Sequence, residues 1–109
     1  MTFNEYQKES RKTVVYPSAG NNMIYPTLGL SAEAGEVANK VKKVLRDQRG
    51  QFGQESKKDI SAEVGDVLWY CAQLATELGL SLDDIATSNL DKLFSRKDRG
   101  VLGGSGDER

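Results

Sequence analysis

Histidine is missing from this 109-residue sequence, and that absence removes several kinds of active site at once. Histidine is the commonest general base, so Ser-His-Asp and Cys-His arrangements for nucleophilic catalysis are excluded. A structural zinc site is also disfavoured, because such sites use histidine or several cysteines. Any catalysis must therefore rely on carboxylates, lysine, tyrosine or a hard metal ion.

Cysteine, net charge and long apolar runs are equally scarce. The single cysteine, Cys71, excludes an internal disulfide and suits a reducing cytoplasm. A net charge of −1 provides no global field to attract nucleic acid or an anionic membrane. No run approaches the roughly 20 apolar residues that span a bilayer, and the polar N-terminus has no apolar signal core. We therefore expect a cytoplasmic protein with neither nucleic acid nor membrane as a partner.

Strand signals are absent too, because no stretch alternates convincingly between apolar and polar residues. Apolar residues recur instead at helical spacing, which predicts an all-α fold with helices near residues 3–13, 27–46, 58–78 and 81–97. We expect a helical domain over residues 1–99, followed by a Gly-rich tail over residues 100–109. The short link after residue 78 predicts that the third and fourth helices are antiparallel in a four-helix bundle. The core of so small a chain is modest, so we expect oligomerisation to complete it.

One seven-residue phrase occurs twice, as SAEAGEV at residues 31–37 and SAEVGDV at residues 61–67. Helical residues three apart are neighbours, so Glu33 lies beside Glu36, and Glu63 beside Asp66. If the two helices pack side by side, the four carboxylates converge, repel one another and favour a bound Mg²⁺ or Mn²⁺. The alternative is that each pair is ordinary solvated surface.

Each copy also places a glycine between its acids, at Gly35 and Gly65. Glycine inside a helix costs about 1 kcal/mol relative to alanine. A physical reason to keep it is the close approach of a neighbouring backbone or a ligand. The glycines thus favour a contact at the acid pairs.

In this order and at these spacings, the motifs resemble those of the MazG-like nucleoside triphosphate pyrophosphohydrolases, in the all-α NTP pyrophosphatase group. That family carries E-E-x-x-E and then E-x-x-D on two antiparallel helices. The matching segments are AEAGE at residues 32–36 and EVGD at residues 63–66, and GDVLWY, NLDKLFSRKDRG and GGSGDER are also similar to family members. The similarity runs from about Tyr6 to Arg109. One position departs from the pattern, because Ala32 stands where the family has its first glutamate.

The resemblance implies a Mg²⁺-dependent enzyme, with Mn²⁺ able to substitute, that cleaves a (d)NTP to a (d)NMP and pyrophosphate by attack of water on the α-phosphate. It assigns the metal ligands as Glu33, Glu36, Glu63 and Asp66. Either Glu33 or Glu36 would orient the water, and the sequence does not distinguish between them. The departure at Ala32 leaves this set of four intact. A homodimer or homotetramer is expected.

Candidate substrate-binding residues follow from helical spacing and from the family's N-x-x-K-L-x-x-R stretch. Asn89, Lys92 and Arg96 share one face of the predicted fourth helix, where the cations would hold the β- and γ-phosphates and Asn89 the sugar or base. Tyr70 continues the line of the second acid pair and would reach the site. Lys43, like Lys40, is a weaker candidate, because lysine beside glutamate on a helix often only forms an i,i+4 pair. The alternative is that this face of the predicted fourth helix is ordinary solvated surface.

Other aromatic residues and Cys71 are predicted to pack. Trp69 lies off the acidic line and is expected in the core or at a subunit contact, and Tyr6, Tyr16 and Tyr25 are each expected to pack rather than stack on a nucleobase. The rival to the enzyme hypothesis is a non-catalytic helical interaction module whose acidic faces only bind cations or a partner.

Overall fold

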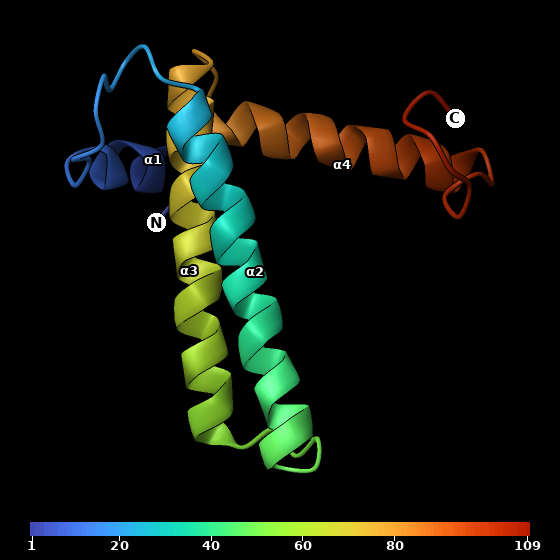
Figure 1. Cartoon of the computed structure of the whole chain (residues 1–109). Coiled ribbons are helices and arrows are strands. Elements are labelled where there is room, and N and C mark those ends of the chain that lie inside the picture. Colours follow the sequence, from blue (N-terminus) through green and yellow to red (C-terminus); the bar gives the residue numbers. More distant parts are fainter.

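The computed structural model describes all 109 residues as four helices without a strand, which confirms the all-α prediction. The helices are α1 (Phe3–Arg11), α2 (Ile24–Asp47), α3 (Gln54–Glu77) and α4 (Leu82–Asp98). The long helices α2 and α3 form an antiparallel hairpin, and α1 and α4 lie at its open end (Figure 1). No helix of the structure combines the length and apolar character needed to cross a membrane.

The hairpin is held by apolar residues of α2 and α3 that recur every three or four positions, including Val37, Val41 and Val44 on α2. The turn after α2 includes Gly50, whose φ of +73° suits glycine and whose N–H donates to the Val44 carbonyl at 3.1 Å. Ser56 Oγ then donates to Gln48 Oε1 at 2.8 Å across the turn. These contacts set how far α2 and α3 are shifted along each other, and therefore which residues of the two acid pairs lie side by side.

Both long helices begin earlier than the periodicity predicts. Helix α2 starts at Ile24 rather than near residue 27, so Pro26 lies in its first turn. Proline is tolerated there because the first backbone N–H groups of a helix have no intrahelical acceptor. Helix α3 starts at Gln54 rather than near residue 58, with Gly53 as its N-cap.

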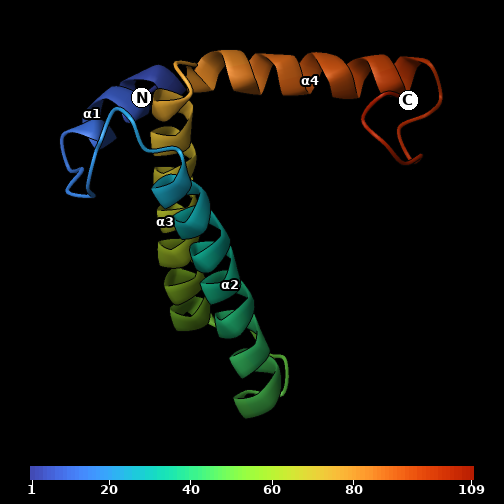
Figure 2. The same ribbon diagram turned by 45° about the horizontal axis from the view of Figure 1, so that its top comes forward.

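The prediction that α4 runs antiparallel to α3 is wrong, since α4 leaves the end of the hairpin and projects sideways in both views (Figures 1 and 2). Helix α1 holds it there. Leu82 N–H donates to Gln7 Oε1 at 2.8 Å, and the Gln7 side-chain amide donates to the Leu80 carbonyl at 2.9 Å. Helix α1 also packs against α3, so it connects α4 to the end of the hairpin.

A buried carboxylate fastens the loop between α1 and α2 to the end of α3. The Glu77 side chain is fully buried and accepts from the Asn22 and Gly20 N–H groups, at 2.7 and 2.9 Å. It also accepts from the Tyr16 hydroxyl at 2.9 Å and from Arg11 Nη2 at 2.8 Å. Burial opposes ionisation of Glu77, but these hydrogen bonds outweigh it and lower the pKa to about 2.

One chain buries little apolar surface. Only ten of the 109 residues are buried, and the core cluster consists of Ala72, Ala75 and Leu82. The radius of gyration is 16.8 Å, against about 13 Å expected for a compact domain of this length. Large apolar side chains remain exposed, with Leu28 at 65% and Phe94 at 58%.

Candidate metal and nucleotide site

The hairpin brings together three of the four predicted carboxylates. Oxygen atoms of Glu33 on α2 and of Glu63 and Asp66 on α3 all lie within 4.8 Å of one another. Helical periodicity explains this, because each acid sits on the side of its helix that borders the other helix. Glu33 and Glu63 are half-buried and Asp66 is exposed, so the cluster lies at the surface of the seam between α2 and α3.

The cluster has no counter-charge within the chain. No ion pair of the structure involves Glu33, Glu63, Asp66 or Glu36. Burial and repulsion by the neighbouring Asp66 and Glu63 carboxylates raise the pKa of Glu33. An all-oxygen, uncompensated donor set fits a hard divalent cation such as Mg²⁺ or Mn²⁺.

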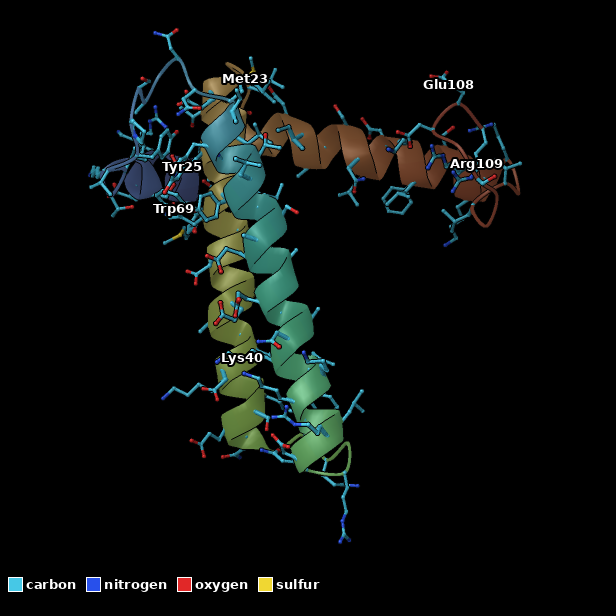
Figure 3. All side chains as sticks on the ribbon, in the orientation of Figure 1. Met23, Tyr25, Lys40, Trp69, Glu108 and Arg109 are labelled. Carbon is cyan, nitrogen blue, oxygen red and sulfur yellow. The ribbon has the colours of Figure 1, made fainter.

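The fourth predicted ligand, Glu36, is exposed and lies outside this close group. It still adds to the negative field that raises the pKa of Glu33, so it lies near the cluster. Lys43 is exposed two helical turns beyond Glu36, about 10 Å farther along the axis of α2. Lys40 likewise lies down the hairpin, away from the aromatic residues at its open end (Figure 3).

Four aromatic rings form a cluster near the open end of the hairpin, and Tyr70 is the ring that lies beside the carboxylates. Tyr16 stacks on Tyr25 with ring centroids 5.0 Å apart, and Trp69 meets Tyr70 edge-on at 5.0 Å. Tyr25 and Trp69 lie together near the open end of the hairpin (Figure 3). Burial and the nearby Tyr25 and Glu33 raise the pKa of Tyr70, which places Tyr70 beside the cluster. Trp69 is half-buried and donates to Thr13 Oγ1 at 2.8 Å, so it anchors the residues after α1 to α3.

A pocket of about 280 Å³ opens next to Glu33, and its lining consists of Tyr25, Leu28, Gly29, Ala32 and Tyr70. Gly29 is required here, because a Cβ at this position would overlap the Tyr70 ring. Ala32, where the family places a glutamate, keeps this wall small and uncharged. The pocket thus joins two aromatic rings to the edge of a carboxylate cluster.

The sequence predicts only a packing role for Tyr25, yet it lines this pocket. Its signal is visible once α2 begins at Ile24: Tyr25, Gly29, Ala32, Glu33 and Glu36 then follow one another at steps of one, three or four along one face. With a helix start at residue 27, Tyr25 falls in a loop and the stripe is cut short.

The glycines inside the repeated phrase do not mark a contact between the helices. A Cβ at Gly35 or at Gly65 would meet no atom within 4 Å. The expectation that a neighbouring backbone approaches them is therefore wrong within one chain, where Gly29 is the glycine that α3 approaches. The space beside both glycines is open toward solvent.

Helix α4 carries the predicted phosphate-binding residues away from the carboxylates. It contacts α1 and α3 but not α2. Lys92 and Arg96 converge instead on Asp107 in the tail, while Asn89 is exposed beside Ile85 and Lys92 along a shallow groove. One chain therefore gathers the carboxylates and Tyr70 but not the α4 residues.

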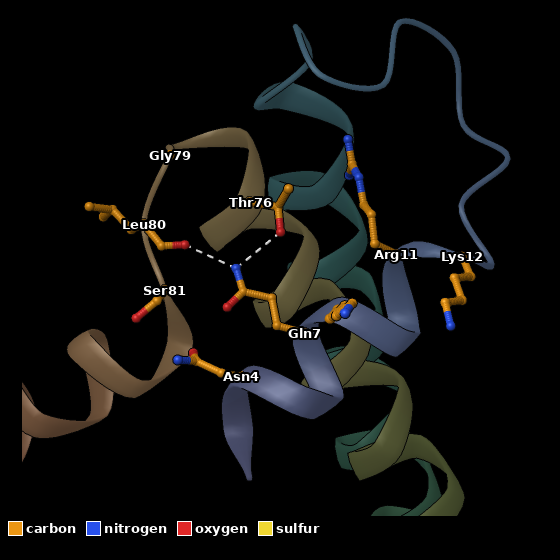
Figure 4. Close-up of a pocket in the computed structure, with 9 residues that line it drawn as sticks. Asn4, Gln7, Arg11, Lys12, Thr76, Gly79, Leu80 and Ser81 are labelled. Atoms are coloured by element: carbon orange, nitrogen blue, oxygen red, sulfur yellow. Dashed lines mark hydrogen bonds between the residues drawn. The ribbon is translucent and has the colours of Figure 1, made fainter.

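A larger pocket of about 620 Å³ lies elsewhere, between α1 and the turn into α4. Gln7 donates to Thr76 Oγ1 and to the Leu80 carbonyl across its floor (Figure 4). Three cations, Lys8, Arg11 and Lys12, line it, and two of them already have partners, because Arg11 pairs with Glu77 and Lys12 with Glu9. No carboxylate lines this pocket, so it lacks the chemistry of the seam between α2 and α3.

Comparison with known proteins agrees with the geometry. A model of the MazG nucleotide pyrophosphohydrolase domain matches residues 26–101, a range that contains every predicted metal-binding and substrate-binding residue, from Glu33 to Arg96. The gene 37 protein of Mycobacterium phage L5 is 52% identical over 109 residues, covering 95% of this chain and 96% of the phage protein. No solved structure showed a significant match. The chain belongs to the MazG nucleotide pyrophosphohydrolase family.

Proposed function

We propose that this protein is a Mg²⁺-dependent nucleoside triphosphate pyrophosphohydrolase that cleaves a (d)NTP to a (d)NMP and pyrophosphate. The observation that carries the proposal is the convergence of Glu33, Glu63 and Asp66 from two helices without any cationic partner. Family membership supports the same reaction class. A protein acting on nucleotide pools would work in the cytoplasm, where its single free cysteine stays reduced.

The carboxylates would hold the metal, with Glu36 completing the set from the next turn of α2. Mg²⁺ bound there would polarise a phosphoryl oxygen and lower the pKa of an attacking water. Glu33 is the better placed of the two candidate bases, because its carboxylate lies within the close group on α2 and α3, whereas that of Glu36 lies outside it. Glu36, being exposed, is better suited to holding water at the rim of the site.

The pocket beside Glu33 would receive the nucleobase. Tyr25 and Tyr70 offer ring faces or edges for a flat heterocycle, and Leu28 adds apolar surface. A base seated there would place the α-phosphate toward the carboxylates, because the pocket residues Gly29 and Tyr70 lie one helical turn from Glu33 and Asp66, respectively. This orientation would favour cleavage of the anhydride bond between the α- and β-phosphates.

The triphosphate still needs cations that the hairpin itself does not supply. Asn89, Lys92 and Arg96 on α4 are the candidates, and α4 projects away from its own hairpin (Figure 2). We infer that α4 of a second subunit reaches the carboxylates, which would make a homodimer, or a homotetramer built from such dimers, the active form. The exposed Phe94 and Ile85 on α4 would be buried by the same contact.

Removal of one carboxylate tests the metal site. Glu63→Gln preserves side-chain size but withdraws one charge from the cluster, so we expect weakened Mg²⁺ binding and loss of pyrophosphate release by at least about 100-fold. Circular dichroism should show unchanged helicity. Asp59→Asn is the matched control, because it removes a carboxylate one turn away that lies outside the cluster. Equal activity of the Glu63→Gln variant and the wild type in Mg²⁺ would refute the metal site and favour the non-catalytic interaction module.

A further inference from the structure

The Gly-rich tail folds back onto the end of α4. Gly100, with φ of +73°, turns the chain after the helix, and the Val101 N–H donates to the Arg96 carbonyl at 2.9 Å. The Arg109 guanidinium then closes the loop by donating to the carbonyls of Val101 and Leu102, at 3.1 and 3.0 Å. Arg109 accordingly lies against the far end of α4 (Figure 3). Residues 100–109 thus form a defined strap.

The strap places one carboxylate on the two cations of α4. Asp107 Oδ1 lies 3.3 Å from Lys92 Nζ and 3.3 Å from Arg96 Nη2. Arg96 Nη2 also donates to the Asp107 carbonyl at 2.7 Å. Under the strap Arg96 is only 4% exposed. Asp107 therefore occupies the position that a phosphate oxygen would take between these cations.

Asp107 nonetheless leaves part of the hydrogen-bonding capacity of the Arg96 guanidinium unused. Its Nε is buried without a hydrogen-bond acceptor, and only Nη2 reaches the tail. A guanidinium pairs best with a carboxylate or phosphate that accepts two parallel bonds, which Asp107 does not provide. The Asp107 side chain is 84% exposed, and ion pairs at such exposure are weak. A polyphosphate, with more charge and more acceptor oxygens, has the advantage in any competition for Arg96.

We propose that Asp107 is an internal competitor of the polyphosphate chain, so that the strap closes over Lys92 and Arg96 in the free protein and is displaced when a triphosphate binds. The proposal rests on the proposed function in one respect, namely that these two cations hold phosphates. It adds an autoinhibitory contact: the strap must leave before Arg96 becomes accessible. The Gly103, Gly104 and Gly106 positions give the strap the backbone freedom to do so.

The test measures binding of inorganic tripolyphosphate to the full-length protein by calorimetry, without Mg²⁺ so that the carboxylate cluster takes no part. Asp107→Asn removes the competing charge and should tighten binding about two- to five-fold, the range that corresponds to the coupling of an exposed ion pair. Glu108→Gln is the matched control. It removes one negative charge from the residue next to Asp107, and the Glu108 side chain forms no ion pair. An equal effect of both variants, or no binding of tripolyphosphate to either, would overturn the proposal.

A second measurement follows the strap directly. In the wild type, saturation with tripolyphosphate should increase the fast-timescale mobility of the backbone amides of residues 101–109 in NMR relaxation, while residues 54–77 remain rigid. A strap that stays ordered at saturation would contradict the proposal. Nucleotide hydrolysis with Mg²⁺ is assayed separately. If the protein hydrolyses nucleotides but Asp107→Asn binds tripolyphosphate no more tightly, only the competition by Asp107 is refuted. If Asp107→Asn binds more tightly but no nucleotide is hydrolysed, only the proposed enzymatic function is refuted.

Discussion

At the scale of single residues, the environments of Glu77 and Glu33 have opposite effects on the ionisation of a carboxyl group. Glu77 is buried and surrounded by four donors, so it is ionised and structural. Glu33 is partly buried among carboxylates, so its ionised form is disfavoured and its pKa is raised. The hydrogen bonds to Glu77 stabilise the fold, whereas the carboxylates around Glu33 repel one another and a bound cation would reduce that repulsion.

Glu77→Gln should lower the free energy of unfolding by about 2–4 kcal/mol at pH 7, because Arg11 loses its carboxylate partner. In addition, the glutamine NH₂ group is a donor and cannot accept the backbone N–H groups that the second carboxylate oxygen accepts. The folded pKa of about 2 lies below the ordinary 4.5, so this stabilisation is complete above about pH 4.5 and is lost as the pH falls toward 2. Chemical denaturation of both proteins across this range measures it. A stability difference that does not change between pH 6 and pH 2.5 would contradict the role assigned to Glu77.

Much of the carboxylate cluster was predictable from residue spacing, because helical periodicity alone puts Glu33, Glu63 and Asp66 along one seam. The displacement of Glu36 from the close group was not predictable, since spacing does not encode the rotamer that carries a carboxylate at the end of a flexible side chain. Nor was the Asp107 contact, which depends on how a Gly-rich segment without periodicity folds back.

At the scale of elements, the angle between helices was harder to predict than the helices themselves. The four helices follow from apolar periodicity and from capping residues such as Thr2 and Ser81, whose side chains accept from Glu5 N–H and Asp84 N–H. The direction of α4 instead depends on Gln7 and Asn4 of α1, which accept hydrogen bonds from the first turn of α4. These partners are more than seventy residues apart, so a local pattern does not reveal them.

The packing of α2 against α3 gives a paired prediction at this scale. Gly29→Ala should lower the stability by about 1–3 kcal/mol, because the added methyl group forces the Tyr70 ring out of its place. Gly35→Ala should raise it by about 0.5–1 kcal/mol, since its Cβ meets no atom and alanine favours the helix. Thermal unfolding of the two variants provides the comparison. Equal effects of the two substitutions would show that Tyr70 does not lie against Gly29.

At the scale of the whole molecule, a single chain has a small core and does not bring all the candidate site residues together. Its core is thin, α4 carries exposed apolar side chains, and the candidate phosphate-binding residues lie apart from the carboxylates. A second chain whose α4 crosses the first hairpin would remedy all three at once. The modest size of the core predicts a partner subunit from the sequence, but the sequence does not indicate which helix would reach across.

Mixed subunits test that arrangement. Glu63→Gln and Arg96→Ala should each be inactive alone, but together they form hybrid dimers in which one of the two sites has both residues intact. Random exchange in an equal mixture should restore about a quarter of the wild-type rate. A mixture of Glu63→Gln with Asp66→Asn is the control, because both defects affect the same carboxylate cluster and no hybrid site is intact. No recovery in the first mixture would show that each site is confined to one chain.

The central claim is tested most directly by incubating the purified protein with a panel of NTPs and dNTPs in Mg²⁺ and ¹⁸O-enriched water, and by identifying the products by mass spectrometry. The account predicts pyrophosphate and a nucleoside monophosphate that carries the ¹⁸O label, with both products lost on chelation of Mg²⁺ and in Glu63→Gln. Release of orthophosphate and a nucleoside diphosphate, or no turnover of any nucleotide in the panel, would contradict it.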